Sequence, residues 1–196
     1  MATDSNLKIL LIDENRGRSA ILERALSDIG HQVIDILHSG ENLSQRVAEL
    51  QPDAIIIDLE SPSRDTLEQM RCISRDNPRP VVMFSDDNDS ALIKQAVEAG
   101  VSAYVVDGLS DTRIKPLMDV AIARFREYQA LKEELTRVKT TLEERKIIDK
   151  AKGMLMKHKQ CDEEEAYQLL RKTAMNKNLR LIDVARNLVT SLELLG

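Results

Sequence analysis

The sequence predicts an α/β protein: a five-stranded, doubly wound parallel sheet, followed by a long coiled-coil helix and a small three-helix domain. Three observations predict this fold. Short apolar runs alternate with amphipathic segments up to about residue 106, a long stretch without glycine follows, and two short amphipathic segments close the chain. Strands that alternate with helices through short connections indicate a parallel sheet covered on both faces.

The expected strands are short apolar runs, which lie at residues 7–12, 33–37, 54–57, 81–84 and 103–106. Between them, apolar residues recur at helical spacing, which predicts helices over residues 16–29, 41–50, 64–76 and 89–98. Gly30 and Gly100 follow two of these helices, where a left-handed residue commonly ends a helix. Pro52 and Pro78 follow the other two, and proline does not continue a helix.

A different pattern begins at Asp111. No glycine interrupts residues 109–152, and the single proline there, Pro116, is early enough for a first helical turn or so. Apolar residues then recur at intervals of three and four, as in a coiled-coil seam: Tyr128, Leu131, Leu135, Val138 and Leu142. The seam predicts a homodimer. Because it spans barely two heptads, packing of the stripe on its own domain is the alternative.

Two short helices are expected after the long one. Gly153 and the polar segment 157–161 should end the long helix. Asp162 is suited to cap a helix at about 163–176, which has three glutamates in its first turn, where the helix dipole favours them. After a turn, residues 181–195 form a final amphipathic pattern.

We therefore expect a domain over residues 1–125, a long dimerising helix over 111–145 and a helical domain over 135–196. With 42% hydrophobic and 31% charged residues, the chain can bury a core. No secretory signal is visible, and no apolar run reaches the roughly 18 residues that span a membrane, so we expect a cytoplasmic protein without membrane contact. Cys72 and Cys161 lack metal-ligand spacing and are expected to be reduced thiols.

Charge is distributed unevenly along the chain. Residues 1–110 hold 10 Lys/Arg against 19 Asp/Glu, a net charge of −9, whereas residues 145–180 hold 10 against 5, a net charge of +5. A polyanion such as a nucleic acid would therefore meet the C-terminal part. Scattered solvated charge is the alternative, because three glutamates at 163–165 interrupt the basic zone.

Acidic and hydroxyl side chains stand at the ends of four expected strands: Asp13 with Glu14, Asp58, Ser85 and Asp107. Ligands of open parallel sheets bind beyond the carboxyl ends of the strands, so these side chains should converge. Asp13 and Asp58 offer hard oxygens that suit weak Mg²⁺ binding. Asp58 is placed to accept a phosphoryl group, with Ser85 in reach of a phosphoryl oxygen. Acids that merely cap the following helices are the alternative.

At these residues, positions 1 to about 125 resemble the receiver domain of bacterial response regulators, which has a flavodoxin-like fold. The resemblance implies that the acidic pair Asp13 and Glu14 binds metal and that Asp58 is the phosphoacceptor. It also implies that Ser85 reports phosphorylation and that Tyr104 is the switching aromatic residue.

Position 107 departs from the family pattern. Where the family has an active-site lysine, this chain has Asp107, and Lys115-Pro116 lies eight residues further on. A lysine would pair with the phosphoryl group, whereas Asp107 adds negative charge beside a group that carries about −1.5 to −2. Phosphorylated Asp58 would lose a charge-assisted partner and meet repulsion. We therefore expect a degenerate receiver in which phosphorylation is not the main switch.

The C-terminal part resembles the ANTAR domain, the RNA-binding antiterminator module of the AmiR/NasT family. The motifs that carry the resemblance are Ala151-Lys152-Gly153-Met154-Leu155-Met156, Glu165-Ala166-Tyr167 and Leu169-Leu170-Arg171. With the receiver in front, the resemblance spans the whole chain, and the Val-Val-Asp-Gly and Asp-Glu-Asn segments resemble the NasT branch, which acts in nitrate and nitrite assimilation. It implies binding to stem-loops of leader mRNA and control by a ligand-sensing protein partner, here a nitrate or nitrite sensor.

The basic zone offers candidate RNA contacts. Its cations are placed to meet phosphates: Lys150, Lys152, Lys157, Arg171, Lys172, Lys177 and Arg180. Tyr167 could stack on an unpaired base, and Gln168 or Asn178 could read base edges. Arg171 lies four residues after Tyr167 and hence on the same helical face. The alternative is a partly buried Tyr167 among solvated lysines.

We therefore expect a transcription antitermination regulator that is not an enzyme, requires no cofactor and binds Mg²⁺ weakly at most. One alternative is a phosphorylation-driven two-component regulator that binds DNA, because segments 163–176 and 181–195 superficially suit a helix-turn-helix. The would-be recognition helix, however, contains a single cation, Arg186. The other alternative is a purely protein-binding adaptor, which would leave the basic zone unexplained.

Overall fold

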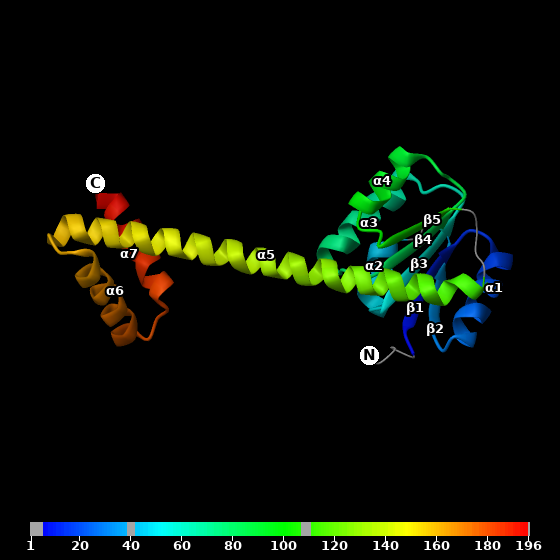
Figure 1. The fold of residues 1–196 in the computed structure, drawn as a ribbon, viewed down its shortest axis with the longest axis horizontal. Coiled ribbons are helices and arrows are strands. Elements are labelled where there is room, and N and C mark those ends of the chain that lie inside the picture. Colours follow the sequence, from blue (N-terminus) through cyan, green and yellow to red (C-terminus); the bar gives the residue numbers. More distant parts are fainter. Residues whose placement is uncertain (1–5, 39–41, 107–110, 196) are drawn as a thin grey trace. The chain divides into compact units, whose positions relative to one another are not determined.

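The computed structural model describes residues 6–38, 42–106 and 111–195. These residues form two compact units that divide between Gln129 and Ala130. Figure 1 shows the order of the elements: alternating strands and helices, then a long helix, then two shorter helices.

The first unit is built on a parallel sheet with the strand order β2-β1-β3-β4-β5. Its strands are β1 Lys8–Asp13, β2 Gln32–Leu37, β3 Ala54–Leu59, β4 Val81–Ser85 and β5 Ala103–Val106. Its helices are α1 Arg16–Asp28, α2 Leu43–Leu50, α3 Arg64–Asp76, α4 Ser90–Glu98 and the start of α5, Asp111–Lys159. The predicted doubly wound α/β fold is confirmed, with the strand order of flavodoxin-like sheets.

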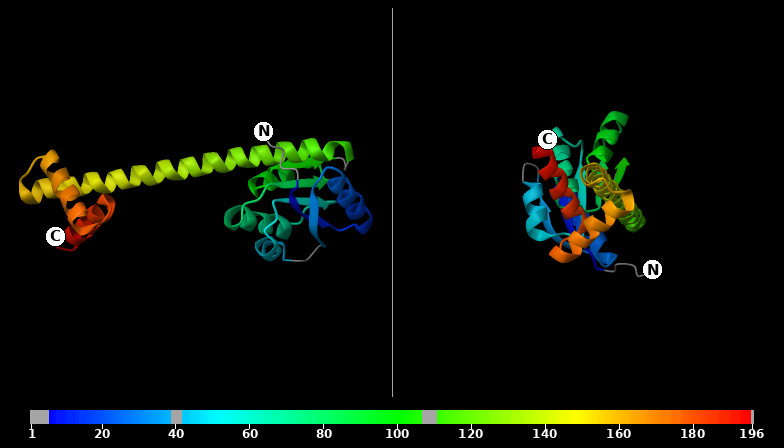
Figure 2. Two further views of the ribbon diagram at one scale, coloured as in Figure 1. Left: turned by 90° about the horizontal axis from the view of Figure 1, so that it is seen from below. Right: turned by 90° about the vertical axis from the view of Figure 1, so that its left-hand side faces the viewer.

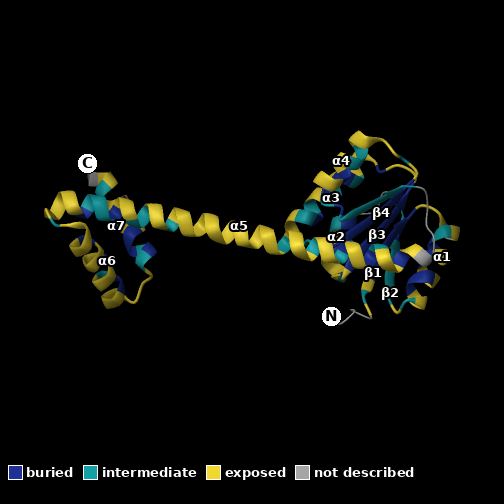
Figure 3. Ribbon diagram, in the orientation of Figure 1, coloured by how far each residue is buried: buried dark blue, intermediate teal, exposed yellow. Residues whose placement is uncertain are grey.

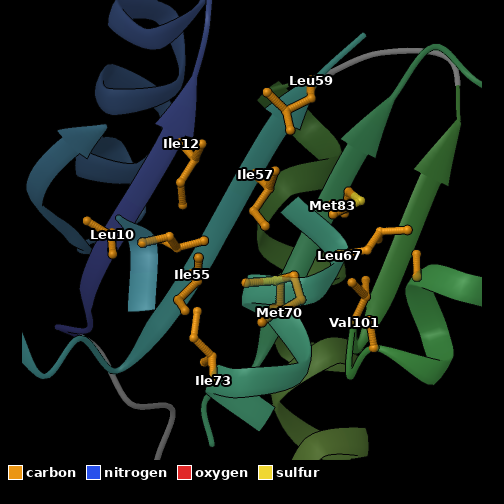
Figure 4. Close-up of a cluster of buried hydrophobic side chains, with 14 of the residues drawn as sticks. Leu10, Ile12, Ile55, Ile57, Leu59, Leu67, Met70, Ile73, Met83 and Val101 are labelled. Carbon is orange, nitrogen blue, oxygen red and sulfur yellow. The ribbon is translucent and has the colours of Figure 1, made fainter. Parts of the chain in front are cut away.

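Each face of the sheet has its own core, because successive residues of a strand point to opposite faces. On one face, Leu10, Ile55 and Met83 pack with residues of α2, α3 and α4 (Figure 4). On the other face, Ile9 and Ile56 pack with residues of α1 and α5, so helices lie on both sides of the strands (Figure 2). Both faces of the central strands therefore carry apolar side chains, and the polar side chains stand at the ends of the strands.

Side-chain caps fix where the helices after the first four strands begin. Each capping residue accepts a hydrogen bond from a backbone amide of the following turn: Asn15, Asn42, Ser63 and Asp89. At the far end of α4, Gly100 has φ +102°, and a Cβ there would lie 2.6 Å from the Cβ of Ser74. Glycine is thus the residue that this stop requires.

Helix α5 ends at Lys159, within the polar segment 157–161 that the sequence predicted as its end. The predicted role of Gly153 is wrong: it is an interior residue, with open space where a Cβ would stand. A glycine costs a helix only about 1 kcal/mol, and the neighbouring residues Ala151 and Leu155 are packed in a core that offsets this cost. The left-handed residue that follows the helix is Gln160, with φ 52°.

The second unit packs the last turns of α5 with α6, Glu163–Lys177, and α7, Leu181–Leu195. Asp162 caps α6 as predicted, in a capping box with Glu165. The three helices share one apolar core: Ala151, Leu155, Ala166, Leu170, Ala174, Val184, Ala185 and Val189. The predicted small three-helix unit is present. No helix within the described residues is both long and apolar enough to cross a membrane.

The five seam residues of α5 are exposed, with fractions from 45% for Val138 to 64% for Leu131. The middle of α5 is accordingly yellow over most of its length in Figure 3. By contrast, Ile114, Met118 and Ala121 of the same helix are buried against the sheet. The described residues therefore leave the seam largely uncovered, so packing of this stripe on its own domain is not observed.

Candidate functional site

Two carboxylates lie side by side at the carboxyl edge of the sheet. Asp13 ends β1, Asp58 is near the end of β3, and the two are Cα partners in the parallel pairing. Asp13 is 0% exposed and Asp58 is 5% exposed. The expected convergence of strand ends thus brings these two acids together, whereas Glu14 is exposed.

The carboxylate pair has unused acceptor oxygens. Asp13 Oδ1 accepts a hydrogen bond from the Asn15 amide at 2.7 Å, but Asp13 Oδ2 and Asp58 Oδ2 are buried with no hydrogen-bond partner among the described residues. Two such hard oxygens fit a Mg²⁺ ion that keeps several waters, and the ion would neutralise charge on a phosphoryl group. The described part of the chain has no cluster of three or more His, Cys, Asp or Glu side chains that could hold a metal ion.

The ionised form of Asp58 is unfavourable in its buried position. Burial raises the pKa of the Asp58 carboxyl, the guanidinium of Arg18 opposes this by lowering it, and the nearby acids Asp13 and Asp86 raise it again. The balance leaves the pKa above its ordinary value, because desolvation of the charged form is the largest contribution. A carboxylate in this state gains from a close cation.

Arg18, which was not among the site residues predicted from the sequence, supplies that cation. Arg18 lies in the first turn of α1, directly after the Asn15 cap. Its Nε stands 3.7 Å from Asp58 Oδ2, and this Nε is buried without a hydrogen-bond partner within the described chain. The signal available in the sequence was its place in the first helical turn after Asp13, at the same sheet edge.

A pocket of about 160 Å³ opens beside Asp58, with these lining residues: Arg18, Ile21, Leu22, Asp58, Phe84, Ser85 and Asp86. The apolar lining comes from Ile21 and Leu22 of α1 and from Phe84 of β4. The volume has room for a few water molecules or one small anion. Asp86 was also absent from the predicted site.

Ser85 and Tyr104, the predicted switch residues, are both bonded to backbone. Ser85 Oγ donates to the Glu60 carbonyl at 2.9 Å and accepts from the Asp87 amide at 3.1 Å. The Tyr104 hydroxyl donates to the Asp87 carbonyl at 2.9 Å, and Ser61 Oγ donates to the Asp87 carboxylate at 2.9 Å. In this arrangement, the hydroxyls of Ser85 and Tyr104 hold the loop after β4.

Two further positions bear on this edge of the sheet. His38, which follows β2, donates from Nδ1 to the Asp13 carbonyl oxygen at 2.9 Å, and the sequence analysis had not included it. Asp107, in the slot of the family's lysine, lies outside the described residues, so its expected repulsion of a phosphoryl group stays a prediction.

In the second unit, α6 has a buried side and an open side. Its core residues are Ala166, Leu170 and Ala174. The open side presents a ring, an amide and two cations, which we call the α6 face: Tyr167, Gln168, Arg171 and Lys172. Tyr167 is 38% exposed, and neither Arg171 nor Lys172 forms an ion pair with another described residue. Most of α6 is yellow in Figure 3.

Three of the predicted RNA-binding cations are paired within the chain. Lys152 has a side chain only 14% exposed, and its Nζ lies 2.7 Å from both Asp149 and Glu163. The other two pairs are Lys150–Glu193 and Arg180–Asp183. The pairs of Lys150 and Lys152 link α5 to α7 and α6, so these two side chains already have partners inside the unit.

Other predicted contacts remain open to solvent. Lys157, Lys177 and Asn178 are exposed, and Asn178 adopts the left-handed conformation, with φ 53°, that ends α6. Helix α7, the would-be recognition helix of a DNA-binding motif, buries Ile182 and Ala185 on one side. Its exposed side carries one cation, Arg186, which is little positive charge for the phosphate contacts of a recognition helix.

The doubly wound sheet and the buried acid pair at its carboxyl edge define the receiver class of signalling domains, here with a three-helix unit attached. Residues 9–118 match the family model of the response regulator receiver domain, and residues 136–189 match that of the ANTAR domain. The receiver match covers more than half of the chain. The chain therefore belongs to the response regulators, a regulatory family, and combines a receiver domain with an ANTAR domain.

Known proteins resemble the chain at several levels. The transcriptional regulatory protein PdtaR of Mycobacterium tuberculosis is 25% identical over 185 residues, which cover 94% of this chain and 90% of that protein. The nitrate regulatory protein of Klebsiella oxytoca is 45% identical over 76 residues, 39% of this chain and 19% of that protein. The signal receiver domain of a modulated diguanylate cyclase from Desulfovibrio desulfuricans G20 aligns with a TM-score of 0.55 at 17% identity, over 62% of this chain and 98% of that chain. The last likeness shows the fold alone.

Proposed function

We propose that this chain regulates transcription antitermination by binding stem-loops of leader mRNA through the α6 face. The observation that carries the proposal is the exposed pair Tyr167 and Arg171 on one side of α6, in a domain that matches the ANTAR model. An exposed aromatic ring stacks on an unpaired base, and a guanidinium without an internal partner binds phosphate or base edges.

The same geometry favours RNA over DNA as the ligand. Single-stranded loops present bases that a tyrosine ring can reach, whereas paired bases in a duplex are stacked on one another. A helix-turn-helix would require α7 to enter a major groove, but the segment Leu181–Leu195 contains a single Lys or Arg, Arg186. Lys172 and Lys177 add exposed charge for the backbone of the RNA loop.

The test is a binding comparison with the full chain at about 0.15 M salt. The ligands are a pool of RNA hairpins with randomised loops, the same stems closed without unpaired bases, and duplex DNA of matched length. We expect the looped RNA to bind at least about tenfold more tightly than the other two. Equal or tighter binding of duplex DNA would contradict the proposal, and no binding to any nucleic acid would favour a protein-binding adaptor.

We further propose that the chain acts as a parallel homodimer joined along the seam of α5. The intervals assign the a and d heptad positions to Tyr128, Leu131, Leu135, Val138 and Leu142. Glu134 then occupies a g position and Lys139 the next e position, so in a parallel pair each Glu134 meets Lys139 of the second copy. Glu127 and Lys132 repeat this relation one heptad earlier.

An antiparallel pair would instead place like charges opposite each other at these flanking positions. Glu134 contacts its own Arg137 at 2.7 Å, but an exposed pair of this kind is worth little and can be exchanged. The exposure of the seam and the complementary flanking charges thus both support a second copy of the same chain as the partner of this helix.

The dimer is tested by replacing Leu135 and Leu142 together with lysine. Charges in the seam should make the protein monomeric in sedimentation equilibrium while the receiver keeps its melting temperature. Thr136→Lys with Thr140→Lys adds the same charge on the outer side of α5 and should leave the dimer intact. The proposal is wrong if the unmodified protein is monomeric at high concentration, both alone and with RNA.

We also propose that a ligand-sensing protein partner, which responds to nitrate or nitrite, controls access to RNA in place of phosphorylation at Asp58. Three observations support it: Asp107 in the lysine slot, the bonding of Ser85 to backbone, and the similarity to the nitrate regulatory protein of Klebsiella oxytoca. The experiment is induction by nitrate in cells that carry Asp58→Ala or Asp58→Asn, with both expected to induce within about twofold of the original chain. If both variants fold, bind RNA in isolation and still fail to induce, phosphate is the signal.

A further inference from the structure

We propose that Arg18 is a built-in counter-ion of the receiver pocket, which occupies the cation's place beside Asp58 and keeps the affinity for divalent metal low. The inference rests on the receiver assignment and not on the proposed RNA function, so either can fail while the other stands. It gives Arg18 a role that neither the resemblance nor the comparisons assign.

Two carboxylate oxygens of the site lack hydrogen-bond partners. Asp13 Oδ2 and Asp58 Oδ2 are buried, and neither accepts a hydrogen bond from another described residue. A divalent ion held between β1 and β3 would use both oxygens. Arg18 Nε lies 3.7 Å from one of them, Asp58 Oδ2, and has no other partner within the described chain. The guanidinium and a metal ion would therefore compete for the same carboxylate.

Local structure fixes the backbone from which the Arg18 side chain extends toward Asp58. Asn15 Oδ1 accepts hydrogen bonds from the amides of Gly17 at 2.9 Å and Arg18 at 3.4 Å, which fixes the first turn of α1. The Asn15 amide in turn donates to Asp13 at 2.7 Å, so β1 and the start of α1 form one hydrogen-bonded corner. The neighbouring walls of the pocket are the apolar side chains of Leu22 and Phe84.

Electrostatics decides which cation the pocket holds. Asp13, Asp58, Asp86 and Arg18 together carry a net charge of about −2, and without Arg18 the three acids would present about −3 to a divalent ion. The repulsion between a guanidinium and a metal on one carboxylate is large at such short separation, even with a high effective dielectric constant. Metal binding must therefore move Arg18 outward, and that cost weakens the binding.

The test counts bound Mn²⁺, a spectroscopic substitute for Mg²⁺, by the loss of the electron paramagnetic resonance signal of the free ion. Arg18→Gln and Arg18→Met remove the charge, and each should bind Mn²⁺ at least about tenfold more tightly than the original chain. Arg18→Lys keeps a charge and should show a much smaller gain. Adding Asp58→Asn to Arg18→Gln should abolish the gain.

Two results of this titration would overturn the proposal. One is an unchanged or weaker Mn²⁺ affinity in folded Arg18→Gln and Arg18→Met. The other is a gain that survives Asp58→Asn, because the metal would then be bound elsewhere.

A measurement on the unmodified protein does not depend on the folding of any variant. The ¹⁵N resonance of Arg18 Nε should shift as Mg²⁺ is added, with the same midpoint as metal binding, because the ion displaces the guanidinium. Metal binding with no change at Arg18 Nε would also overturn the proposal.

Discussion

The receiver and the ANTAR unit treat charge in opposite ways. In the receiver, Asp13 and Asp58 are buried and the guanidinium of Arg18 lies beside Asp58, so part of the negative charge of the site is compensated inside the protein. On the α6 face, Arg171 and Lys172 are exposed and form no ion pair with another described residue. Because a buried charge must be compensated locally and an exposed one attracts an outside polyanion, the first arrangement suits a closed regulatory pocket and the second suits binding.

The largest effect should follow a change on the α6 face. Arg171→Ala removes a cation that has no internal partner, so it should weaken RNA binding by about 1–3 kcal/mol and leave the helical fold intact. The measurement is RNA affinity by fluorescence anisotropy, with circular dichroism as the check on folding. An unchanged affinity in a folded variant would remove Arg171 from the binding surface.

Lys150→Ala is the matched control, because Lys150 belongs to the same unit but is paired with Glu193. Its side chain already has a partner inside the protein, and loss of an exposed pair costs little. We expect the RNA affinity of this variant to stay within about 0.5 kcal/mol of the original. If this variant loses as much RNA affinity as Arg171→Ala, then a cation with an ion-pair partner inside the protein can still bind RNA, and the pairing is no guide to the binding surface.

In the receiver, a buried hydroxyl should matter for stability and not for RNA. Ser85→Ala leaves the Glu60 carbonyl and the Asp87 amide without their partner, which should lower the free energy of unfolding by about 1–2 kcal/mol. Urea denaturation measures the change, and RNA affinity should be unaffected. Ser27→Ala, at an exposed position of α1, is the control and should lie within about 0.5 kcal/mol.

The buried carboxylate should make receiver stability depend on pH. Because the pKa of Asp58 is raised in the folded protein, folding favours its protonated form, and the ionised form destabilises the receiver above the folded pKa. Asp58→Asn should therefore raise the free energy of unfolding by about 1 kcal/mol at pH 7. The gain should shrink as the pH falls toward the ordinary Asp pKa of about 3.9. Thermal melts between pH 7 and pH 4 test this, and a less stable Asn variant at pH 7 would mean that pairing with Arg18 outweighs desolvation.

The smallest effect concerns His31, whose pKa is lowered because burial disfavours the charged ring. Asp119 partly opposes this by raising the pKa, and Lys115 lowers it further. The neutral ring accepts a hydrogen bond from the Leu7 amide at 3.4 Å, so its contribution is present above about pH 6.5 and is lost as the pH falls below it. His31→Gln should reduce the loss of stability between pH 7.5 and pH 5.5 by a few tenths of a kcal/mol, after allowance for solvent screening.

Local patterns predicted most of the fold. The ranges 64–76 and 181–195 agree with α3 and α7 at both ends, and Asp162 caps α6 as expected. Apolar periodicity and side-chain caps act over a few residues, so they can be read directly from the chain. The same local patterns wrongly predicted a helix end at Gly153. A glycine ends a helix only where the chain must turn, and here the packing around Ala151 keeps the helix intact.

The sequence by itself determined the chemistry that is present: a doubly wound sheet with acids at its strand ends, an apolar seam and a basic C-terminal zone. Only the tertiary structure decided which charges are already in use. Lys150 pairs with Glu193, 43 residues away in the chain, and Arg18 reaches Asp58 across the strand edge. Such pairs depend on how elements that are far apart in the sequence pack together. The spacing of residues within one helix or strand therefore does not predict them. The tertiary structure thus distinguishes Arg171, whose side chain is open to a partner, from cations that are already paired within the chain.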